Sequence, residues 1–416
     1  MGCIHSSGSI LNKAMPSRTD AIQGTNFSVE DLERLLTSDL QTNAKFASFT
    51  LAPVGEAKGL LSSMVKLSVQ WTEESESLPE SFLLKIPSAE AIKAIGSGVG
   101  GNSENEARVM AAHNCECAFY RATKGYQWKP IITRCYFADN IDPTAGRLGL
   151  LVLEDFTGKC HVRRLSEPKP VSQALLLEIA ESVAALHAFS LNNPSKWKGN
   201  PDLGVNLSHL MLHNPQSMAG WMKTGTEAMK EKWPERFDPL IDRLVEMYAS
   251  KDDFEYAFKD HLDHKLPEVL VHGDFHLSNI LLRTDQNGDE RLLAIVDWQV
   301  VHGGSIAEDF ARLLSSSVNS KVRRDSTLPI LRHYYSSLRE RIAQPPFSFD
   351  QLVSSYNRLF KFGTLAIAAG LPVIPQWEFG GQEKEKEALE EVLDRAVCLV
   401  EDAVKIEKEK VSPWKE

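Results

Sequence analysis

The spacing of apolar residues changes once along the 416-residue chain, and this change limits the folds that the chain can adopt. Apolar and polar residues alternate in residues 61–71, which is the pattern of a half-buried β-strand. Further apolar segments predict strands at 81–86, 131–138 and 148–153. Helix-start patterns at Ser28-x-x-Asp31 and Ser103-x-x-Glu106 predict two helices in the same region. The first part of the chain is therefore predicted to be rich in strands.

After Glu154 the apolar residues follow helical spacing instead. The clearest case is 172–191, where one stripe of apolar residues marks a helix that faces a core. A short β-like insert is expected at 268–297, and the charged stretch 383–410 is predicted to be a solvated amphipathic helix. These patterns favour an α+β protein with three parts: a flexible leader at 1–25, a β-rich lobe at 26–153 and a mainly helical lobe at 154–416.

Composition narrows the functional classes. The formal net charge of −10 argues against a nucleic-acid partner, because no basic surplus exists to neutralise phosphates. The six cysteines form neither a regular framework nor a CxxC pair, which favours a reduced intracellular setting. No uninterrupted run of 18 apolar residues occurs, and the N-terminus lacks the apolar core of a signal peptide. We therefore expect a cytoplasmic protein.

The N-terminal sequence MGCIHSS carries a possible membrane anchor. Gly2, with Ser6 four positions later, matches the pattern for N-myristoylation after removal of Met1. Cys3 is placed for palmitoylation, and two acyl chains give the stable anchoring that one does not. Acylation at Gly2 and Cys3 would place the protein on the cytoplasmic face of a membrane.

The segment 268–299 contains the residues with the most specific chemical pattern. His272, Asp274 and Asn279 lie on a predicted loop between two apolar strands, and Asp297 ends the next strand. Phosphoryl transfer to an alcohol needs a carboxylate that orients the hydroxyl and oxygen ligands that hold Mg²⁺ on the nucleotide phosphates. Asp274 is the candidate base, and Asn279 and Asp297 are the candidate metal ligands. The alternative is that Asp274 and Asn279 only form a hydrogen-bonded turn.

A second pair of polar residues interrupts apolar elements in the β-rich part. Lys85 lies within an apolar strand, and Glu116 shares a helix face with Val109, Ala112 and Phe119. An inward carboxylate needs a cationic partner, and a strand Lys paired with a helix Glu can hold the α- and β-phosphates of ATP. The alternative is a surface helix with Glu116 at the edge of its apolar face. Glu106 is the rival partner for Lys85.

Two weaker features concern nucleotide binding. Gly55 and Gly59 precede the alternating strand and are candidates for a turn that covers the phosphates, although they match no standard glycine motif. Glu154 lies where the strand-rich and helix-rich parts join. The backbone there is the expected contact for an adenine edge between the lobes.

The order Lys85, Glu116, Asp274, Asn279, Asp297, together with HGDFHLSNILL and IVDWQ, resembles the aminoglycoside phosphotransferase and choline kinase superfamily. The segments VGEAKGLLSSMVKLSVQW, HNCECAFYRA and HGGSIAEDFARLL look like the ecdysteroid-kinase-like (CHK kinase-like) families within it. The resemblance covers about residues 28–400. It implies a protein-kinase-like bilobal fold, ATP and Mg²⁺ as cofactors, and a supporting role for His272 and Asp309. The sequence departs from the family at Phe275-His276, where related proteins usually carry Leu-Trp, and this departure concerns the acceptor.

The chain lacks the long activation segment and the Ala-Pro-Glu motif with which protein kinases dock peptides, so a small-molecule alcohol is the expected acceptor. The resemblance implies an ecdysteroid-like or other sterol alcohol, and a choline-like amino alcohol is the alternative. Asp274-Phe275-His276 also matches the Asp-x-His of two-metal phosphoesterases, but the further ligands of such a site are missing. A non-catalytic nucleotide-binding scaffold stays open as a third interpretation.

Overall fold

The computed structural model describes residues 17–54, 61–73, 76–88, 102–126, 132–204, 226–238, 242, 259–370 and 383–415. The chain forms two compact units. The first comprises Met1–Cys117 and Arg134–Asp155, and the second comprises Ala118–Thr133 and Phe156–Glu416. The division after Asp155 lies two residues beyond the boundary expected from the sequence. Residues 118–133, expected in the first lobe, belong to the second unit.

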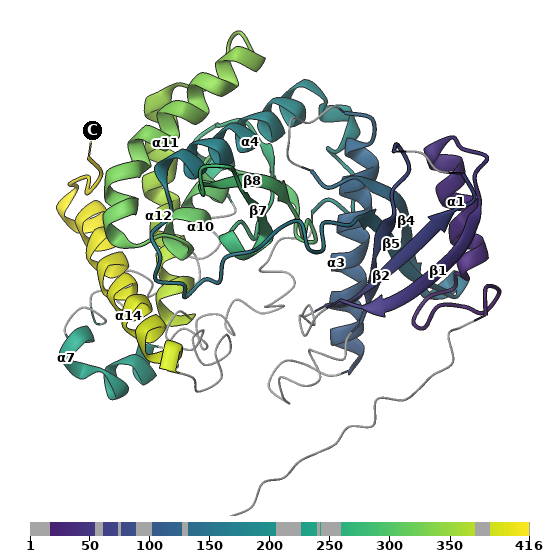
Figure 1. Ribbon diagram of the computed structural model, residues 1–416. Helices are drawn as coiled ribbons and strands as arrows, with labels where there is room; N and C mark the ends of the chain where they lie inside the picture. Colours follow the sequence, from purple (N-terminus) through teal and green to yellow (C-terminus); the bar gives the residue numbers. More distant parts are fainter. Residues whose placement is uncertain are drawn as a thin grey trace, which may run out of the picture. The chain divides into compact units, whose positions relative to one another are not determined.

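The first unit contains a five-stranded antiparallel sheet in the order β1-β2-β3-β5-β4 (Figure 1). Its strands are β1 (Phe46–Pro53), β2 (Ser62–Trp71), β3 (Ser81–Pro87), β4 (Cys135–Asp142) and β5 (Arg147–Glu154). The last two are joined by a short 3₁₀ turn, η1 (Pro143–Ala145). Strand β4 begins four residues later than the sequence predicts. Ile132, which the apolar pattern assigned to the same strand, instead makes an isolated bridge to Ile295 in the second unit.

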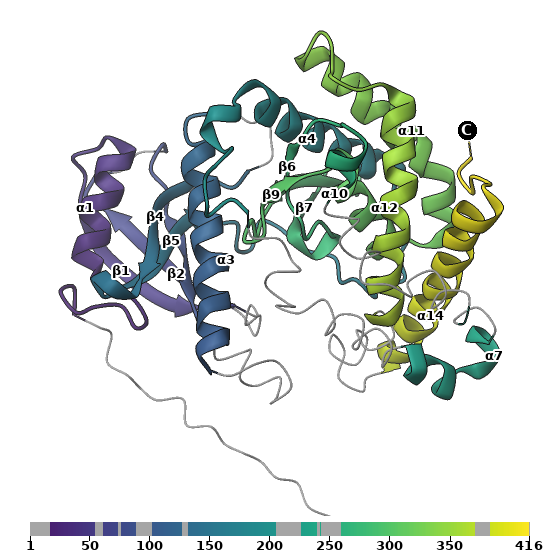
Figure 2. The same cartoon turned by 180° about the vertical axis from the view of Figure 1, so that it is seen from behind.

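Helix α1 (Val29–Leu40) packs on one face of this sheet. Its predicted capping box is present, because the Ser28 side chain accepts from the Asp31 backbone and the Asp31 carboxylate accepts from the Ser28 backbone. The core beneath it combines apolar residues of the helix and of alternate strand positions (Val29, Leu32, Leu36, Leu67, Phe82, Leu84, Ile86, Val152). Helix α3 (Asn102–Thr123) lies on the other side of the sheet (Figures 1 and 2).

The first unit begins before residue 26. Ile22 is buried in the core, and Ala21 pairs with Ser28 in an isolated β-bridge. Arg18 forms an ion pair with Glu33 of α1. Residues 17–25 therefore pack against the unit, whereas the sequence suggested a leader as far as residue 25. Gly2 and Cys3 lie outside the described residues.

The second unit is mainly helical, with two small antiparallel β-pairs. Strand β6 (Val269–Val271) pairs with β9 (His302–Gly304), and β7 (Ile280–Thr284) pairs with β8 (Glu290–Ile295). Its described helices include α4 (Gln173–Asn192), α7 (Pro234–Phe237), α10 (Glu308–Ser316), α11 (Ser320–Arg341), α12 (Phe349–Gly370) and α14 (Glu383–Val404). Short helical turns lie at η2 (Pro194–Lys196), η3 (Leu277–Asn279) and η5 (Lys405–Glu409). A strand-rich unit followed by a helical unit confirms the α+β, protein-kinase-like fold class expected from the sequence.

Helix α4 is long and apolar enough to cross a membrane by length and composition, but 72% of its most apolar window is buried inside the protein. Its Ser172 N-cap accepts from the Leu175 backbone, and Leu175, Leu176, Ile179 and Val183 are all buried. These properties are those of a core helix in a globular unit.

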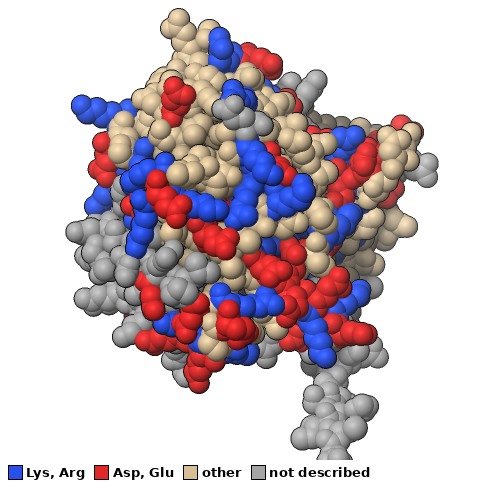
Figure 3. All heavy atoms as spheres, turned by 90° about the vertical axis from the view of Figure 1, so that its left-hand side faces the viewer, with Lys and Arg blue, Asp and Glu red and all other residues tan. Residues whose placement is uncertain are grey.

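Helix α14 is amphipathic, as its charge pattern predicts, but two of its charged side chains are buried. Val392, Leu399 and Val400 are buried, and so are the charged side chains Arg395 and Asp402. Its outer side matches the expectation better, because Asp394 and Glu390 are exposed and pair with Arg236. Basic and acidic side chains lie interspersed on the face drawn in Figure 3. The helix therefore has one solvated side and one side that is built into the unit.

Candidate active site

Lys85 and Glu116 form a buried ion pair in the first unit. Alternation along β3 places Phe82, Leu84 and Ile86 in the core on one face, so Lys85 faces the opposite side, where α3 lies. Its Nζ lies 2.5 Å from Glu116 Oε2, and their side chains are 9% and 1% exposed. Glu106, the rival partner, is exposed. The strand lysine and the helix glutamate that the sequence singled out therefore meet.

The other two candidates for nucleotide binding are placed differently. Glu154 is the last residue of β5, where its backbone N–H donates to the Arg134 carbonyl and its neighbour across the sheet is Phe82 of β3. Gly55 and Gly59 lie outside the described residues. For the described part of the first unit, the Lys85–Glu116 pair is the feature that fits a phosphate-binding role.

The loop between β6 and β7 in the second unit is fixed by a buried carboxylate on helix α10. Asp309 accepts from the backbone N–H groups of His272 (2.8 Å, to Oδ2) and Gly273 (3.1 Å, to Oδ1). Gly273 has φ +81°, and a Cβ there would lie 2.5 Å from the Val300 carbonyl oxygen. Only glycine fits this position without displacing the backbone. Asp309 and Gly273 together set the path of the loop just before Asp274.

His272 supports the same loop from inside. Its ring is fully buried and contacts the Val296 carbonyl through Nε2 at 3.0 Å. Burial lowers the pKa of His272, so the ring stays neutral at physiological pH. The ring packs against Trp298 at a centroid distance of 4.6 Å, and Trp298 in turn stacks on Phe119. His272 is thus a buried packing and hydrogen-bonding group.

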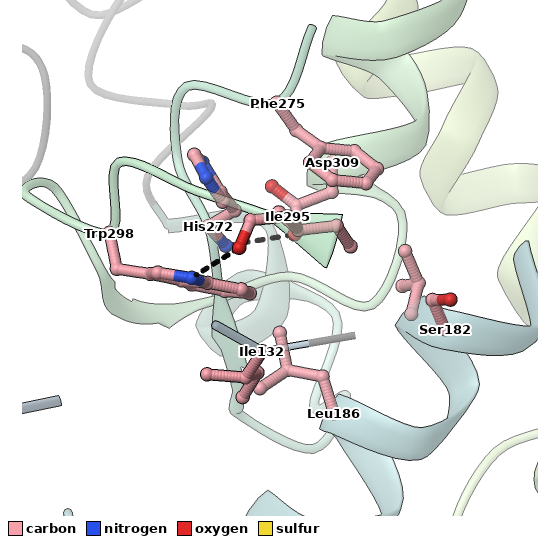
Figure 4. A pocket seen from close by; sticks show the side chains of 9 residues that line it. Ile132, Ser182, Leu186, His272, Phe275, Ile295, Trp298 and Asp309 are labelled. Carbon is pink, nitrogen blue, oxygen red and sulfur yellow. Dashed lines mark hydrogen bonds between the residues drawn. The ribbon is translucent and has the colours of Figure 1, made fainter. Parts of the chain in front are cut away.

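A small apolar cavity lies beneath the loop (Figure 4). Its volume is about 10 Å³, which is at the lower limit for a single water molecule. It is lined by His272, Phe275, Trp298, Asp309 and apolar residues of α4 and β8. The cavity is too small for a substrate and reflects packing between the loop and the core helix.

Asp274 is the partly exposed carboxylate at the tip of the loop. Arg312 of α10 donates from Nη2 to Asp274 Oδ1 at 2.9 Å, and His276 Nε2 lies 3.3 Å from Asp274 Oδ2. Burial raises the pKa of Asp274, but the charges and hydrogen bonds of His276 and Arg312 outweigh it. They hold the pKa of this carboxyl well below its usual range. Asp274 is therefore ionised throughout the physiological range.

Asn279 is the last residue of this loop, and Asp297 lies close to it. Asn279 donates from Nδ2 to the Asp274 carbonyl at 2.9 Å. The Val296 backbone connects the two segments, because its N–H donates to the Asn279 carbonyl while its own carbonyl contacts His272. Asp297 follows Val296 directly. The structure therefore brings residues 274, 279 and 297 to one edge of the second unit.

Asp297 has a left-handed backbone with φ +68°, which is uncommon for a residue other than glycine. Its Oδ2 accepts from Gln299 Nε2 at 3.1 Å. Strained backbone of this kind costs about 1–3 kcal/mol and is often found at functional sites. The carboxylate of Asp297 and the amide oxygen of Asn279 are both hard oxygen ligands, the type that Mg²⁺ prefers. These two oxygen donors fit a magnesium ion, which would take its remaining ligands from other groups such as water or phosphate.

Comparison with known proteins places the chain in a family. The model of DUF1679, described as "uncharacterized oxidoreductase dhs-27", matches residues 16–411. The chain belongs to the DUF1679 family.

Curated relatives of this DUF1679 protein come from Caenorhabditis elegans. An uncharacterized kinase-like protein is 23% identical over 380 residues, covering 88% of this chain and 96% of the relative. The uncharacterized oxidoreductase dhs-27 is 22% identical over 365 residues, covering 83% of this chain but only 41% of the relative. The DUF1679 chain thus matches the kinase-like relative over nearly its whole length and dhs-27 over less than half.

Solved structures similar to the DUF1679 chain are more distant. An ethanolamine kinase of Plasmodium vivax is 14% identical with a TM-score of 0.40, covering 88% of this chain and 85% of the other. A type VIII aminoglycoside-3'-phosphotransferase is 14% identical with a TM-score of 0.36, covering 76% and 94%.

Sequence reasoning missed Arg312 in this DUF1679 chain, and it considered His276 only as a departure from the family pattern and as part of an Asp-x-His match to two-metal phosphoesterases. Arg312 lies three residues after Asp309, so both face the same side of α10. This spacing was visible in the sequence. The partner was not, because Asp274 lies 38 residues away along the chain.

Asp309 leads to a prediction about stability and pH. Burial raises the pKa of Asp309 to about 7, and Glu308 adds to the rise, while the two N–H donors oppose it. Because the folded-state pKa lies above the unfolded value, the stability contributed by this group is present below about pH 4 and is lost as pH rises towards 7. Relative to an Asp309→Asn variant, the wild-type free energy of unfolding should therefore fall between pH 4 and 7, by up to about 4 kcal/mol.

Urea denaturation of both proteins at several pH values measures this difference. Asp394→Asn is a matched control, because Asp394 is 74% exposed and its pair with Arg236 lies on the surface. The free energy of unfolding of Asp394→Asn should differ little from that of wild type, and this difference should be nearly independent of pH. If the difference in free energy of unfolding between wild type and the Asp309→Asn variant stays constant between pH 4 and 7, the prediction is contradicted.

Proposed function

We propose that this protein is an ATP- and Mg²⁺-dependent phosphotransferase that moves the γ-phosphoryl group of ATP to the hydroxyl of a small molecule. Asp274 is the base that receives the hydroxyl proton. Asn279 and Asp297 hold Mg²⁺, and Lys85, fixed by Glu116, binds the α- and β-phosphates. His272 and Asp309 keep the loop in shape.

The observation that carries this proposal is the arrangement of the loop around Asp274. Its backbone is fixed by Asp309, and the Asn279 amide is tied to the Asp274 carbonyl. Asp297 is held beside Asn279 in a strained backbone conformation. A base and two metal ligands on one edge are what phosphoryl transfer to an alcohol requires. The name of the kinase-like relative supports the same class.

Each group has a definite part in the reaction. The acceptor oxygen forms a bond to the γ-phosphorus, the bond between that phosphorus and the bridging oxygen breaks, and ADP leaves with the electron pair. The hydroxyl proton passes to Asp274, whose low pKa suits orientation of the hydroxyl and late proton transfer in a loose transition state. When bound, Mg²⁺ neutralises charge on the phosphate oxygens. Lys85 does the same from the protein side.

The name of dhs-27 raises oxidoreductase activity as another possibility. The present chain covers 41% of that protein, so the activity behind the name has no necessary counterpart here. For the acceptor, the resemblance of the sequence favours an ecdysteroid-like or other sterol alcohol. A choline-like amino alcohol is the alternative.

A direct assay tests the proposal. The purified protein is incubated with ATP, Mg²⁺ and a panel of sterols and other alcohol-bearing metabolites, and mass spectrometry detects products that have gained one phosphate. We expect one class of alcohol to gain a phosphate with equal release of ADP, and we expect EDTA to abolish the product, because the metal offsets the phosphate charge.

Two controls make the assay decisive. Asp297→Asn should reduce turnover and raise the Mg²⁺ concentration needed, whereas the exposed control Asp394→Asn should behave as wild type. A protein that binds ATP but forms neither ADP nor a phosphorylated product with any acceptor would favour the non-catalytic scaffold.

A further inference from the structure

Both oxygens of the proposed base are engaged by positively charged or potentially charged groups. Arg312 donates to Asp274 Oδ1, and His276 faces Asp274 Oδ2. The three side chains are only 12–26% exposed, so water screens their charges less than at an open surface. The surroundings of the reacting hydroxyl are therefore set by this cluster of Asp274, His276 and Arg312.

The guanidinium is held in place by the helix that carries it. Asp309, one turn earlier on α10, binds the loop backbone, and Arg312 binds the carboxylate that the loop presents. One helix thus positions both the backbone and the side chain of the base. The Arg312 guanidinium is therefore held in a defined position by α10.

The charges in the cluster cancel and leave no net negative charge for a cation. Arg312 is permanently charged and balances Asp274. Within the described part of the chain, Asp274 is the carboxylate with which Arg312 forms an ion pair, and Arg312 Nε is buried without a hydrogen-bond acceptor. Asp297, which follows β8 by two residues, is assigned to Mg²⁺ in the proposed function.

We propose that Arg312 is a specificity-determining residue that selects acceptors with no positive charge beside the reacting hydroxyl. This inference rests on the proposed phosphotransferase function. A quaternary ammonium two carbons from the hydroxyl, as in choline, would lie near the guanidinium and be repelled by it, and this repulsion offsets the attraction of Asp274. An uncharged alcohol meets no such repulsion. The arrangement favours the sterol-like class of acceptor over the amino-alcohol class.

Matched pairs of acceptors test this directly. Each pair consists of a neutral alcohol and its quaternary ammonium isostere, beginning with 3,3-dimethyl-1-butanol and choline and extending to larger alkyl and polycyclic alcohols. Wild-type protein should phosphorylate the neutral member with a kcat/KM at least about tenfold higher than the cationic member. Because the members of a pair match in shape, the ratio isolates the effect of charge.

Variants at residue 312 separate charge from structure. Arg312→Met removes the charge and should lower the neutral-to-cationic ratio by at least about tenfold, whereas Arg312→Lys keeps the charge and should leave the ratio within about threefold of wild type. Arg341→Met is the matched control, because Arg341 pairs with Glu181 on the surface. Its ratio should equal that of wild type. A purely structural role for Arg312 would change both rates together and leave the ratio unchanged.

The outcomes distinguish this inference from the function on which it rests. Wild-type protein that prefers cationic members, or an Arg312→Met variant that folds and keeps the wild-type ratio, would overturn the role of Arg312. Should Arg312→Met fail to fold, the wild-type ratio and Arg312→Lys still decide the question. Phosphorylation of the neutral and the cationic member of each pair at equal kcat/KM would overturn the inference alone, because transfer to an alcohol would still take place. Absence of both hydrolysis and transfer, with ATP bound, would overturn the proposed function itself.

Discussion

Replacing Asp274 with Asn should lower kcat by about 10³-fold while the affinity for ATP stays within about twofold of wild type. Positioned acid–base groups contribute about 10²–10⁴-fold in rate, and Asn has the same shape but cannot accept the proton. The loop should keep its conformation, because Asp309 and Asn279 bind its backbone and not the Asp274 carboxylate. Single-turnover assays measure the rate, and calorimetry measures ATP binding.

Asp394→Asn provides the control for the Asp274 experiment, since it makes the same chemical change at an exposed position. Turnover by Asp274→Asn within about tenfold of wild type would remove Asp274 from its role. A pH profile adds a second check. Because the pKa of Asp274 lies well below its usual range, the wild-type rate should show no acidic limb from this group above about pH 5.

The Asp402→Asn variant should lose about 3–5 kcal/mol in free energy of unfolding, the largest effect on stability that we expect. Asp402 of α14 accepts from Arg323 Nη2 at 2.8 Å, and both side chains are 0% exposed. Arg324 also binds Asp402, at 2.8 Å. Removal of the carboxylate charge leaves the Arg323 guanidinium buried with no opposite charge among the described residues to compensate it. An uncompensated buried charge lowers the free energy of unfolding by far more than a surface ion pair raises it.

Urea and thermal denaturation measure the effect of Asp402→Asn. Arg324→Met is the milder comparison, because Arg324 is 27% exposed and Asp402 keeps Arg323 as its partner. The double variant Arg323→Met/Asp402→Leu should be more stable than Asp402→Asn, since it removes both buried charges. A loss below about 1 kcal/mol in Asp402→Asn would show that water or a shifted side chain compensates Arg323.

Much of the fold followed from local sequence patterns. The capping box at Ser28 and the alternation in β2 and β3 depend on neighbouring residues, and the structure has these elements where they were predicted. The start of β4 was harder to predict, because the apolar residues Ile131 and Ile132 look like part of a strand whichever segment they pair with. Ile132 pairs with Ile295, more than 160 residues away, which no local pattern indicates.

The candidate site was predictable where a polar residue interrupts an apolar segment. Lys85, Asp274 and Asn279 stand out for this reason, and the structure places them on the expected strand and loop. Arg312 and Asp402 do not stand out, because a charged residue on an amphipathic helix looks the same whether it faces water or a buried partner. Only the three-dimensional structure shows that Arg312 meets Asp274 and that Asp402 meets Arg323.

The one-turn spacing of Asp309 and Arg312 on α10 has a practical consequence for protein engineering. Asp309 holds the loop, and Arg312 is the residue that we propose to act on acceptor choice, so a library that randomises the whole helix would mix unfolded variants with those of altered preference. Diversity confined to residue 312 and to His276, which contacts the other oxygen of Asp274, would sample new acceptors on an intact scaffold. Within this helix of nine residues, Asp309 must be kept for the loop to fold, whereas Arg312 can be varied.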